Sequence, residues 1–144
     1  MRCLSLRRAR LGLFGFAVFL TTLVLLADAG RGQWLFQLAN WVPGGDKTGH
    51  FVLFGILAFL VNVVTRASMV RIGRVPLLRG SLLVAVIAAG EEFSQLAFAT
   101  RTFDLRDLGA GLLGIFGIGQ LAVWFLGRER QRGNAAALAD QRAR

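Results

Sequence analysis

Long apolar stretches alternate with short charged segments along the chain. The stretches cover residues 11–27, 48–65, 80–100 and 108–127. Each has 17 to 21 residues, which is the length that a helix rising 1.5 Å per residue needs to cross a membrane. The pattern therefore predicts an all-α fold, an integral membrane bundle of four transmembrane helices.

The composition agrees with this prediction. The chain has 144 residues, the length of one domain, of which 55% are apolar and 17% charged. Soluble domains have about a quarter of their residues charged, so the composition argues against a water-soluble fold. Sixteen arginines and one lysine lie in clusters beside the apolar stretches, which indicates membrane topology rather than nucleic-acid binding. Cys3 is the single cysteine, so no disulfide forms within the chain.

The charged segments also predict an orientation. Thirteen basic and two acidic residues lie in residues 1–10, 66–79 and 128–144, whereas the rest of the chain has four basic and six acidic residues. Loops rich in arginine stay in the cytoplasm, so both termini and the 66–79 loop are expected there. Residues 1–127 then form the membrane domain, and residues 128–144 form a basic, loosely ordered cytoplasmic tail.

Two segments near the first span need separate interpretation. Residues 33–42 contain two tryptophans and predict a short helix lying in the outer membrane interface. The first apolar stretch also resembles a secretory signal, because Ala27-Asp28-Ala29 has the form of a cleavage site. Its length exceeds the roughly 7–15 apolar residues of such signals, which favours an uncleaved anchor.

Polar residues that are rare in membrane helices gather at the outer ends of the predicted spans. Glu92 shares a helix face with Ala88 and Gln95, and Asp107 shares one with Gly111. Small residues let helices approach closely, so both carboxylates are expected to face the bundle. The residues expected to form one polar cluster are Asp46, Lys47, His50, Glu92, Gln95, Arg101, Asp104 and Asp107.

Simpler explanations remain open for single members of this set. Asp46 and Asp104 are also candidates for helix N-caps, because a carboxylate accepts hydrogen bonds from the free N–H groups of a first turn. Lys47, Arg101 and Arg106 are also candidates for interface anchors that reach toward lipid phosphates. These explanations do not require the side chains to meet.

Glu91 and Glu92 resist such an explanation, because an unpaired carboxylate in lipid costs several kcal/mol. Their nearest expected cations are Lys47, Arg101 and a protonated His50. Only Glu92 lies on the small-residue face of its helix. We therefore expect Glu92→Gln to abolish function at normal abundance and Glu91→Gln to be mild.

These polar residues also form a motif. Its parts are Asp46-Lys47-x-x-His50-Phe51, then Glu92-x-x-Gln95, then Arg101-Thr102-Phe103-Asp104-x-x-Asp107 and Gly114. In order and spacing over residues 46–114, the sequence resembles the VanZ-like family of small bacterial membrane proteins. The resemblance implies a multi-span protein of the bacterial cytoplasmic (inner) membrane.

The founding member of that family is associated with lowered sensitivity to teicoplanin, a glycopeptide that acts on cell-wall precursors outside the membrane. The family has no agreed reaction, so the resemblance implies a cell-envelope role without naming an activity. Two positions depart from its pattern. Gly111 stands where the family usually has asparagine, and Phe54 stands where it often has an aromatic hydroxyl.

Three functions fit these residues. The first is binding of an anionic lipid-linked or cell-wall-precursor ligand, with Lys47, Arg101 and Arg106 contacting its phosphate or carboxylate groups. The second is a membrane-embedded hydrolase or transferase with His50 and Glu92 as acid and base. The third is an ion-coupled transporter that uses the paired glutamates. Binding is preferred, because the sequence has no nucleophile motif, no histidine pair and no cysteine ligand. No cofactor and no metal are predicted, and the oligomeric state is left open.

Overall fold

The fold is a bundle of helices with one small β-hairpin. The computed structural model describes residues 6–31, 41, 44–98 and 102–142. The helices are α1 (Leu6–Asp28), α3 (Gly45–Val64), α4 (Arg79–Ser94), α5 (Leu105–Gly117) and α6 (Leu121–Arg142). Short 3₁₀ helices extend α4 (η1, Gln95–Ala97) and join α5 to α6 (η2, Ile118–Gln120). The mostly helical architecture confirms the predicted fold class, apart from the hairpin. The interfacial helix expected over residues 33–42 lies outside the described residues except for Trp41.

Three helices are long and apolar enough to cross a membrane: Leu6–Asp28, Gly45–Val64 and the continuous Leu105–Ala139. Residues 80–100 were also expected to cross the membrane. The α-helix in this stretch, α4, has only 16 residues and is shorter than these three. Near its end the Ser94 hydroxyl donates a hydrogen bond to the Glu91 carbonyl at 2.7 Å, and such bonds compete with the helical ladder. The structure thus supports a membrane protein, and it supports three of the four predicted transmembrane helices by length and composition.

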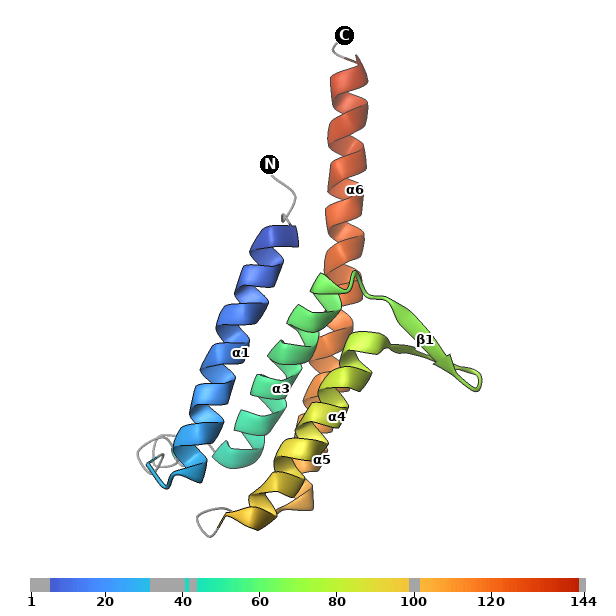
Figure 1. Ribbon diagram of the computed structural model, residues 1–144. Coiled ribbons are helices and arrows are strands. Elements are labelled where there is room, and N and C mark those ends of the chain that lie inside the picture. The colour runs from blue at the N-terminus through green and yellow to red at the C-terminus, as the bar shows by residue number, and fades with distance from the viewer. Residues whose placement is uncertain (1–5, 32–40, 42–43, 99–101, 143–144) are drawn as a thin grey trace.

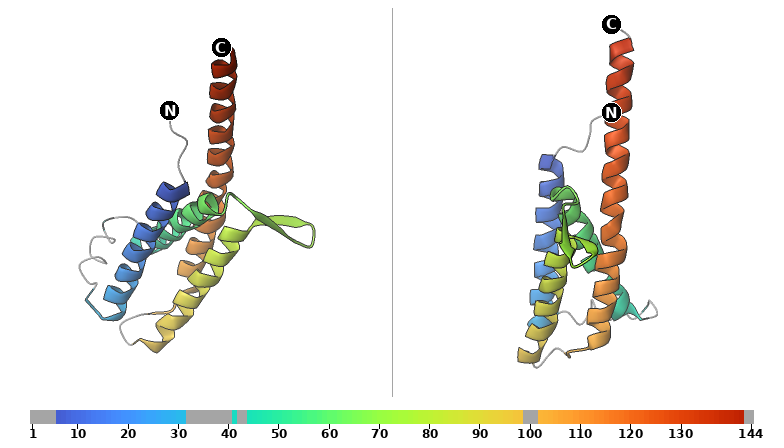
Figure 2. Two further views of the ribbon diagram at one scale, coloured as in Figure 1. Left: turned by 45° about the horizontal axis from the view of Figure 1, so that its top comes forward. Right: turned by 90° about the vertical axis from the view of Figure 1, so that its right-hand side faces the viewer.

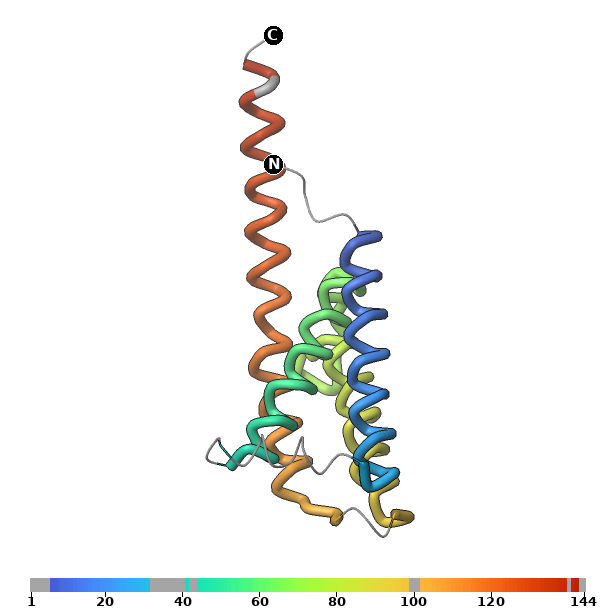
Figure 3. Tube along the Cα trace, turned by 90° about the vertical axis from the view of Figure 1, so that its left-hand side faces the viewer, coloured from blue at the N-terminus to red at the C-terminus, as the bar shows by residue number. Residues whose placement is uncertain are grey.

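The helices arrange the chain so that its two ends differ in character. The start of α1, the end of α3 and the start of α4 lie at one end of the bundle, and α6 projects beyond that end (Figure 1). The start of α3, the end of α4 and the start of α5 lie at the opposite end (Figure 3). The first end therefore carries the arginine-rich segments, and the second carries the polar motif.

The 66–79 segment contains a hairpin that the all-α prediction missed. Strands β1 (Met69–Ile72) and β2 (Val75–Leu78) pair antiparallel. Gly73 occupies the turn with a φ of 62°, a conformation that glycine adopts without strain. Pro76 lies in β2 opposite Arg71, where a strand without a second neighbour tolerates its missing N–H.

The C-terminal segment is helical rather than loosely ordered. α6 continues without a break through residue 127 to Arg142 and extends beyond the other helices (Figure 2). The expectation of a loose tail was wrong because alanine, arginine and glutamine are strong helix formers. An Arg132–Glu129 ion pair at 3.7 Å, one turn apart, adds to this.

Close contact between α3 and α5 forms the core of the bundle. A side chain at Gly114 would overlap the backbone carbonyl of Phe51, and one at Gly55 would lie 3.0 Å from the backbone carbonyl oxygen of Gly114. Glycine at these positions lets the two backbones approach. The apolar core around the contact consists of Phe54, Leu57, Ala58, Val84, Ala88 and Ile115.

A buried polar contact joins the helices nearer the hairpin end. Asn62 is fully buried, and its amide donates hydrogen bonds to the Ser81 hydroxyl at 2.9 Å and to the Gly119 carbonyl at 3.3 Å. This contact ties α3 to α4 and to η2. Sequence analysis did not anticipate it, because Asn62 and Ser81 are isolated polar residues in apolar stretches.

Candidate functional site

Seven of the eight residues predicted to form the polar cluster are described, and they lie at the motif end of the bundle. α3 supplies Asp46, Lys47 and His50, α4 and η1 supply Glu92 and Gln95, and Asp104 and Asp107 flank the start of α5. Arg101 lies outside the described residues. We keep the name polar cluster for the eight predicted residues; Glu91 adjoins them and accepts a hydrogen bond from the Gln95 amide.

Lys47 is the cation at the centre of the polar cluster. Its Nζ donates to Asp107 Oδ1 at 3.0 Å and to Asp104 Oδ2 at 3.4 Å. The Asp107 side chain is only 7% exposed, whereas those of Lys47 and Asp104 are 41% and 39% exposed. The predicted proximity of Lys47 and Asp104 is therefore confirmed, and the ammonium group is oriented by two carboxylates while still open to its surroundings.

Glu92 is buried, with 1% of its surface exposed. Its Oε1 accepts the backbone N–H of Asp104 at 2.8 Å, and its Oε2 accepts the Gln95 amide at 3.3 Å. The prediction that Glu92 faces the bundle is confirmed. Within the described residues, both hydrogen bonds to the Glu92 carboxylate come from neutral donors, and neither comes from the cation that we expected.

Asp104 links the ion pairs of Lys47 to the hydrogen bonds of Glu92. Its side chain caps α5 by accepting the backbone N–H of Arg106 at 2.8 Å, as the N-cap interpretation predicted. That hydrogen bond, with the help of Lys47, lowers the pKa of the Asp104 carboxyl below its ordinary value of 3.8. Glu92 thus fixes the backbone of a residue whose side chain both caps a helix and holds Lys47.

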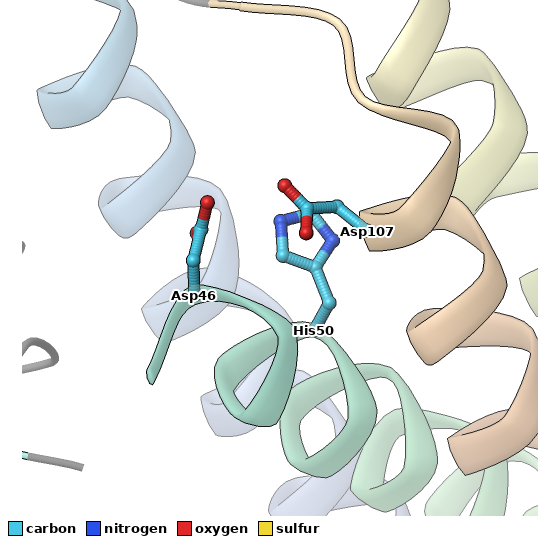
Figure 4. Close-up of side chains that lie close together, drawn as sticks. All are labelled: Asp46, His50 and Asp107. Carbon is cyan, nitrogen blue, oxygen red and sulfur yellow. The ribbon is translucent and has the colours of Figure 1, made fainter. Parts of the chain in front are cut away.

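The N-cap interpretation is wrong for Asp46. Gly44 is the N-cap of α3, with a φ of 65°, and Asp46 lies in the first turn instead. There its carboxylate faces Asp107 across the gap between α3 and α5, close to His50 (Figure 4).

His50 lies between two pairs of carboxylates. One nitrogen of its ring and one oxygen each of Asp46 and Asp107 are within 4.8 Å of one another, and a similar set joins His50 to Glu91 and Glu92. Histidine and carboxylate ligands suit several divalent metals. Sequence analysis predicted no metal, but these two groups have the spacing to hold one. They equally place carboxylates where they could orient His50 as an acid or base.

The two departures from the VanZ-like pattern coincide in space. A side chain at Gly111 would come within 3.3 Å of the Phe54 ring. The Phe54 ring in turn lies 5.7 Å from the ring of His50. Gly111 and Phe54 therefore form apolar packing at one place next to the ring of His50, where the resemblance implied polar groups.

Two further contacts hold the site together, and the first of them was not predicted from the sequence. Phe93 and Phe103 stack with their ring centroids 5.6 Å apart, so the segment leading into α5 is held against the end of α4. Gln95 donates to Glu91 at 3.2 Å as well as to Glu92, so one amide joins the two glutamates. The signal available in the sequence was that Phe93 directly follows Glu92 and Phe103 directly precedes Asp104. Arg106, a predicted anion contact, is exposed beside the polar cluster.

Comparison with known proteins adds one relative. No protein-family model matches the chain, and no solved structure matches it. An uncharacterized protein of the fission yeast Schizosaccharomyces pombe is 34% identical over 98 residues, which is 68% of this chain and 56% of the relative. The chain thus matches just over half of the relative's length. The relative's description names no activity, and its eukaryotic source gives no support to a bacterial location.

Proposed function

We propose that the chain is a four-pass membrane protein of VanZ-like type that binds an anionic, lipid-linked ligand at one membrane surface through the polar cluster. The observation that carries the proposal is Lys47, whose ammonium group is held by Asp107 and Asp104 yet remains 41% exposed. A cation oriented in this way loses little freedom when it binds an anion. Such an arrangement favours recognition of a phosphate or carboxylate head group.

In the proposed topology, α4 and η1 together cross the membrane once, in addition to the three longer helices. The two elements have 16 and 3 residues, which at the rises of α and 3₁₀ helices gives about 30 Å. This matches the hydrocarbon core. The excess of basic residues in segments 1–10, 66–79 and 128–144 favours the cytoplasmic side for that end. The polar cluster then faces outward, in our proposal from the bacterial cytoplasmic membrane.

The charge of the polar cluster narrows the range of ligands that could bind. Two carboxylates pair with Lys47, and Asp46, Glu91 and Glu92 lie close to the neighbouring His50. Together these carboxylates repel a ligand that is purely anionic. Carboxylates readily accept hydrogen bonds from hydroxyl groups. A lipid that carries a phosphate beside a sugar fits both features, and cell-wall precursors are lipids of this kind. Binding one would connect the chain with teicoplanin susceptibility.

Lys47→Gln is the test of this function. The amide keeps a donor for Asp107 but removes the cation, so the affinity for a polyprenyl-phosphate-linked sugar in phosphatidylcholine nanodiscs should fall about tenfold to a hundredfold. Arg132→Gln, which removes an exposed cation from α6, is the matched control and should bind normally. Equal affinity of Lys47→Gln and the wild type would refute the proposal.

A second function is favoured by the position of His50 between two carboxylate pairs. In that case the chain is a hydrolase or transferase for the same class of lipid, with His50 and Glu92 as acid and base. Cleavage of the bound lipid that is lost in His50→Asn, while binding is retained, would favour catalysis. Binding without any turnover would favour the first proposal.

A further inference from the structure

The hairpin β1–β2 has one face made entirely of apolar side chains. Its register pairs Val70 with Leu77 and Ile72 with Val75, and in an antiparallel pair these residues share a face. Ile72 is 57% exposed and Val75 is 56% exposed. An isolated two-stranded hairpin is marginally stable in water, so this face needs an apolar environment to cover it.

The position of the hairpin indicates what that environment is. The chain leaves α3 at Val64 and enters α4 at Arg79, and α3 is long and apolar enough to cross a membrane. The hairpin therefore begins within a few residues of the membrane boundary. The hairpin extends sideways from the bundle, away from the helices (Figures 1 and 2).

The charges of the segment point to anionic lipid. Residues 66–79 contain no acidic residue and four arginines, all of them exposed: Arg66, Arg71, Arg74 and Arg79. Arginine side chains beside an apolar surface reach toward phosphate head groups. Each is worth about 1 kcal/mol near an anionic leaflet.

We infer that the hairpin Met69–Leu78 lies in the membrane interface, with its Val70–Ile72–Val75–Leu77 face toward the acyl chains and its arginines on anionic head groups. The inference rests on α3 crossing the membrane and is independent of the ligand of the polar cluster. It makes the hairpin a lateral anchor that fixes the depth of α3 and α4.

The test uses the full chain in vesicles, with Cys3→Ser and a single cysteine at Val75 labelled with a nitrobenzoxadiazole fluorophore. The control carries the label at Leu138, which is 58% exposed on the projecting part of α6. Dithionite, an aqueous reductant, is added with a pore former so that it reaches both sides. Vesicles contain phosphatidylcholine alone or with phosphatidylglycerol.

The label at Val75 should be reduced at least about tenfold more slowly than the label at Leu138. In anionic vesicles, Arg71→Gln and Arg74→Gln should each raise the rate of reduction of the label at Val75 about fivefold, as expected for the loss of one arginine near an anionic surface. In vesicles of phosphatidylcholine alone, the same substitutions should change this rate little. Equal rates at Val75 and Leu138 would overturn the inference. Protection that disappears on dilution to one chain per vesicle would also overturn it, because a second copy would then cover the face.

Discussion

Gly114→Ala should unfold the bundle more readily than any other single methyl addition in α5. The new Cβ would overlap the carbonyl oxygen of Phe51, which belongs to the backbone of α3 and cannot rotate away. Overpacking costs about 1–3 kcal/mol where side chains can shift, and more where they cannot. We expect the free energy of unfolding in detergent micelles to fall by about 3 kcal/mol, with a matching loss of membrane abundance.

Gly109→Ala is the matched control in the same helix. No atom lies within 4 Å of its added Cβ, and alanine is a better helix former than glycine by about 1 kcal/mol. This variant should be as stable as the wild type or slightly more stable. If Gly114→Ala is tolerated equally well, α3 and α5 do not pack as closely as described.

Glu92→Ala should have the second largest effect, on both stability and binding. It leaves the Asp104 N–H without its acceptor and removes the Glu92 acceptor of the Gln95 amide, which still reaches Glu91. An unsatisfied buried donor costs about 1–3 kcal/mol. Loss of the Asp104 contact also releases one of the two carboxylates that orient Lys47. We expect about 3 kcal/mol of destabilisation and at least a tenfold loss of ligand affinity.

Glu91→Ala is the control, since it removes the same side chain one position earlier. Glu91 is only half-buried, so its loss should cost less than about 1 kcal/mol. Glu92→Gln keeps an oxygen for the Asp104 N–H and should accumulate normally. It also places an amide donor against Gln95 and removes the charge near His50, so it should still lose binding, whereas Glu91→Gln should not. If the Glu91 variants are the more damaging ones, the assignment of the buried face is wrong.

The sequence was sufficient to predict the main helices and the meeting of the polar residues. Long apolar stretches define α1, α3 and the α5–α6 rod because burial in lipid depends on composition over many residues. The polar cluster was predictable because charged residues flanking adjacent spans on one side must lie near each other. Glu92 and Asp107 were placed inside correctly because both follow small-residue faces.

The pairing within the polar cluster was not predictable. Within the described residues, Glu92 accepts the backbone N–H of Asp104, and Lys47, one of its expected partners, pairs with Asp107 and Asp104. Arg101, another expected partner, lies outside the described residues. Which donor reaches a buried carboxylate depends on loop geometry within a few tenths of an ångström, and residue spacing does not give this.

The hairpin carried a signal that was passed over. Val70-Arg71-Ile72 and Val75-Pro76-Leu77 flank Gly73-Arg74, and β-branched residues on both sides of a two-residue glycine turn are typical of a hairpin. The arginines and Pro76 made the segment resemble a charged loop before a helix. The helical extension of α6 was not predictable from polarity alone, because a polar segment is typical of disorder, whereas alanine, arginine and glutamine are good helix formers.

Binding of a lipid-linked anionic ligand by the polar cluster can be tested by mass spectrometry of the lipids that remain bound to the chain purified from its native membrane. We expect one phosphate-linked glycolipid enriched over bulk lipid, lost in Lys47→Gln and retained in Arg132→Gln. A bound fraction that matches bulk lipid, or an enriched lipid that Lys47→Gln retains in full, would contradict this proposal.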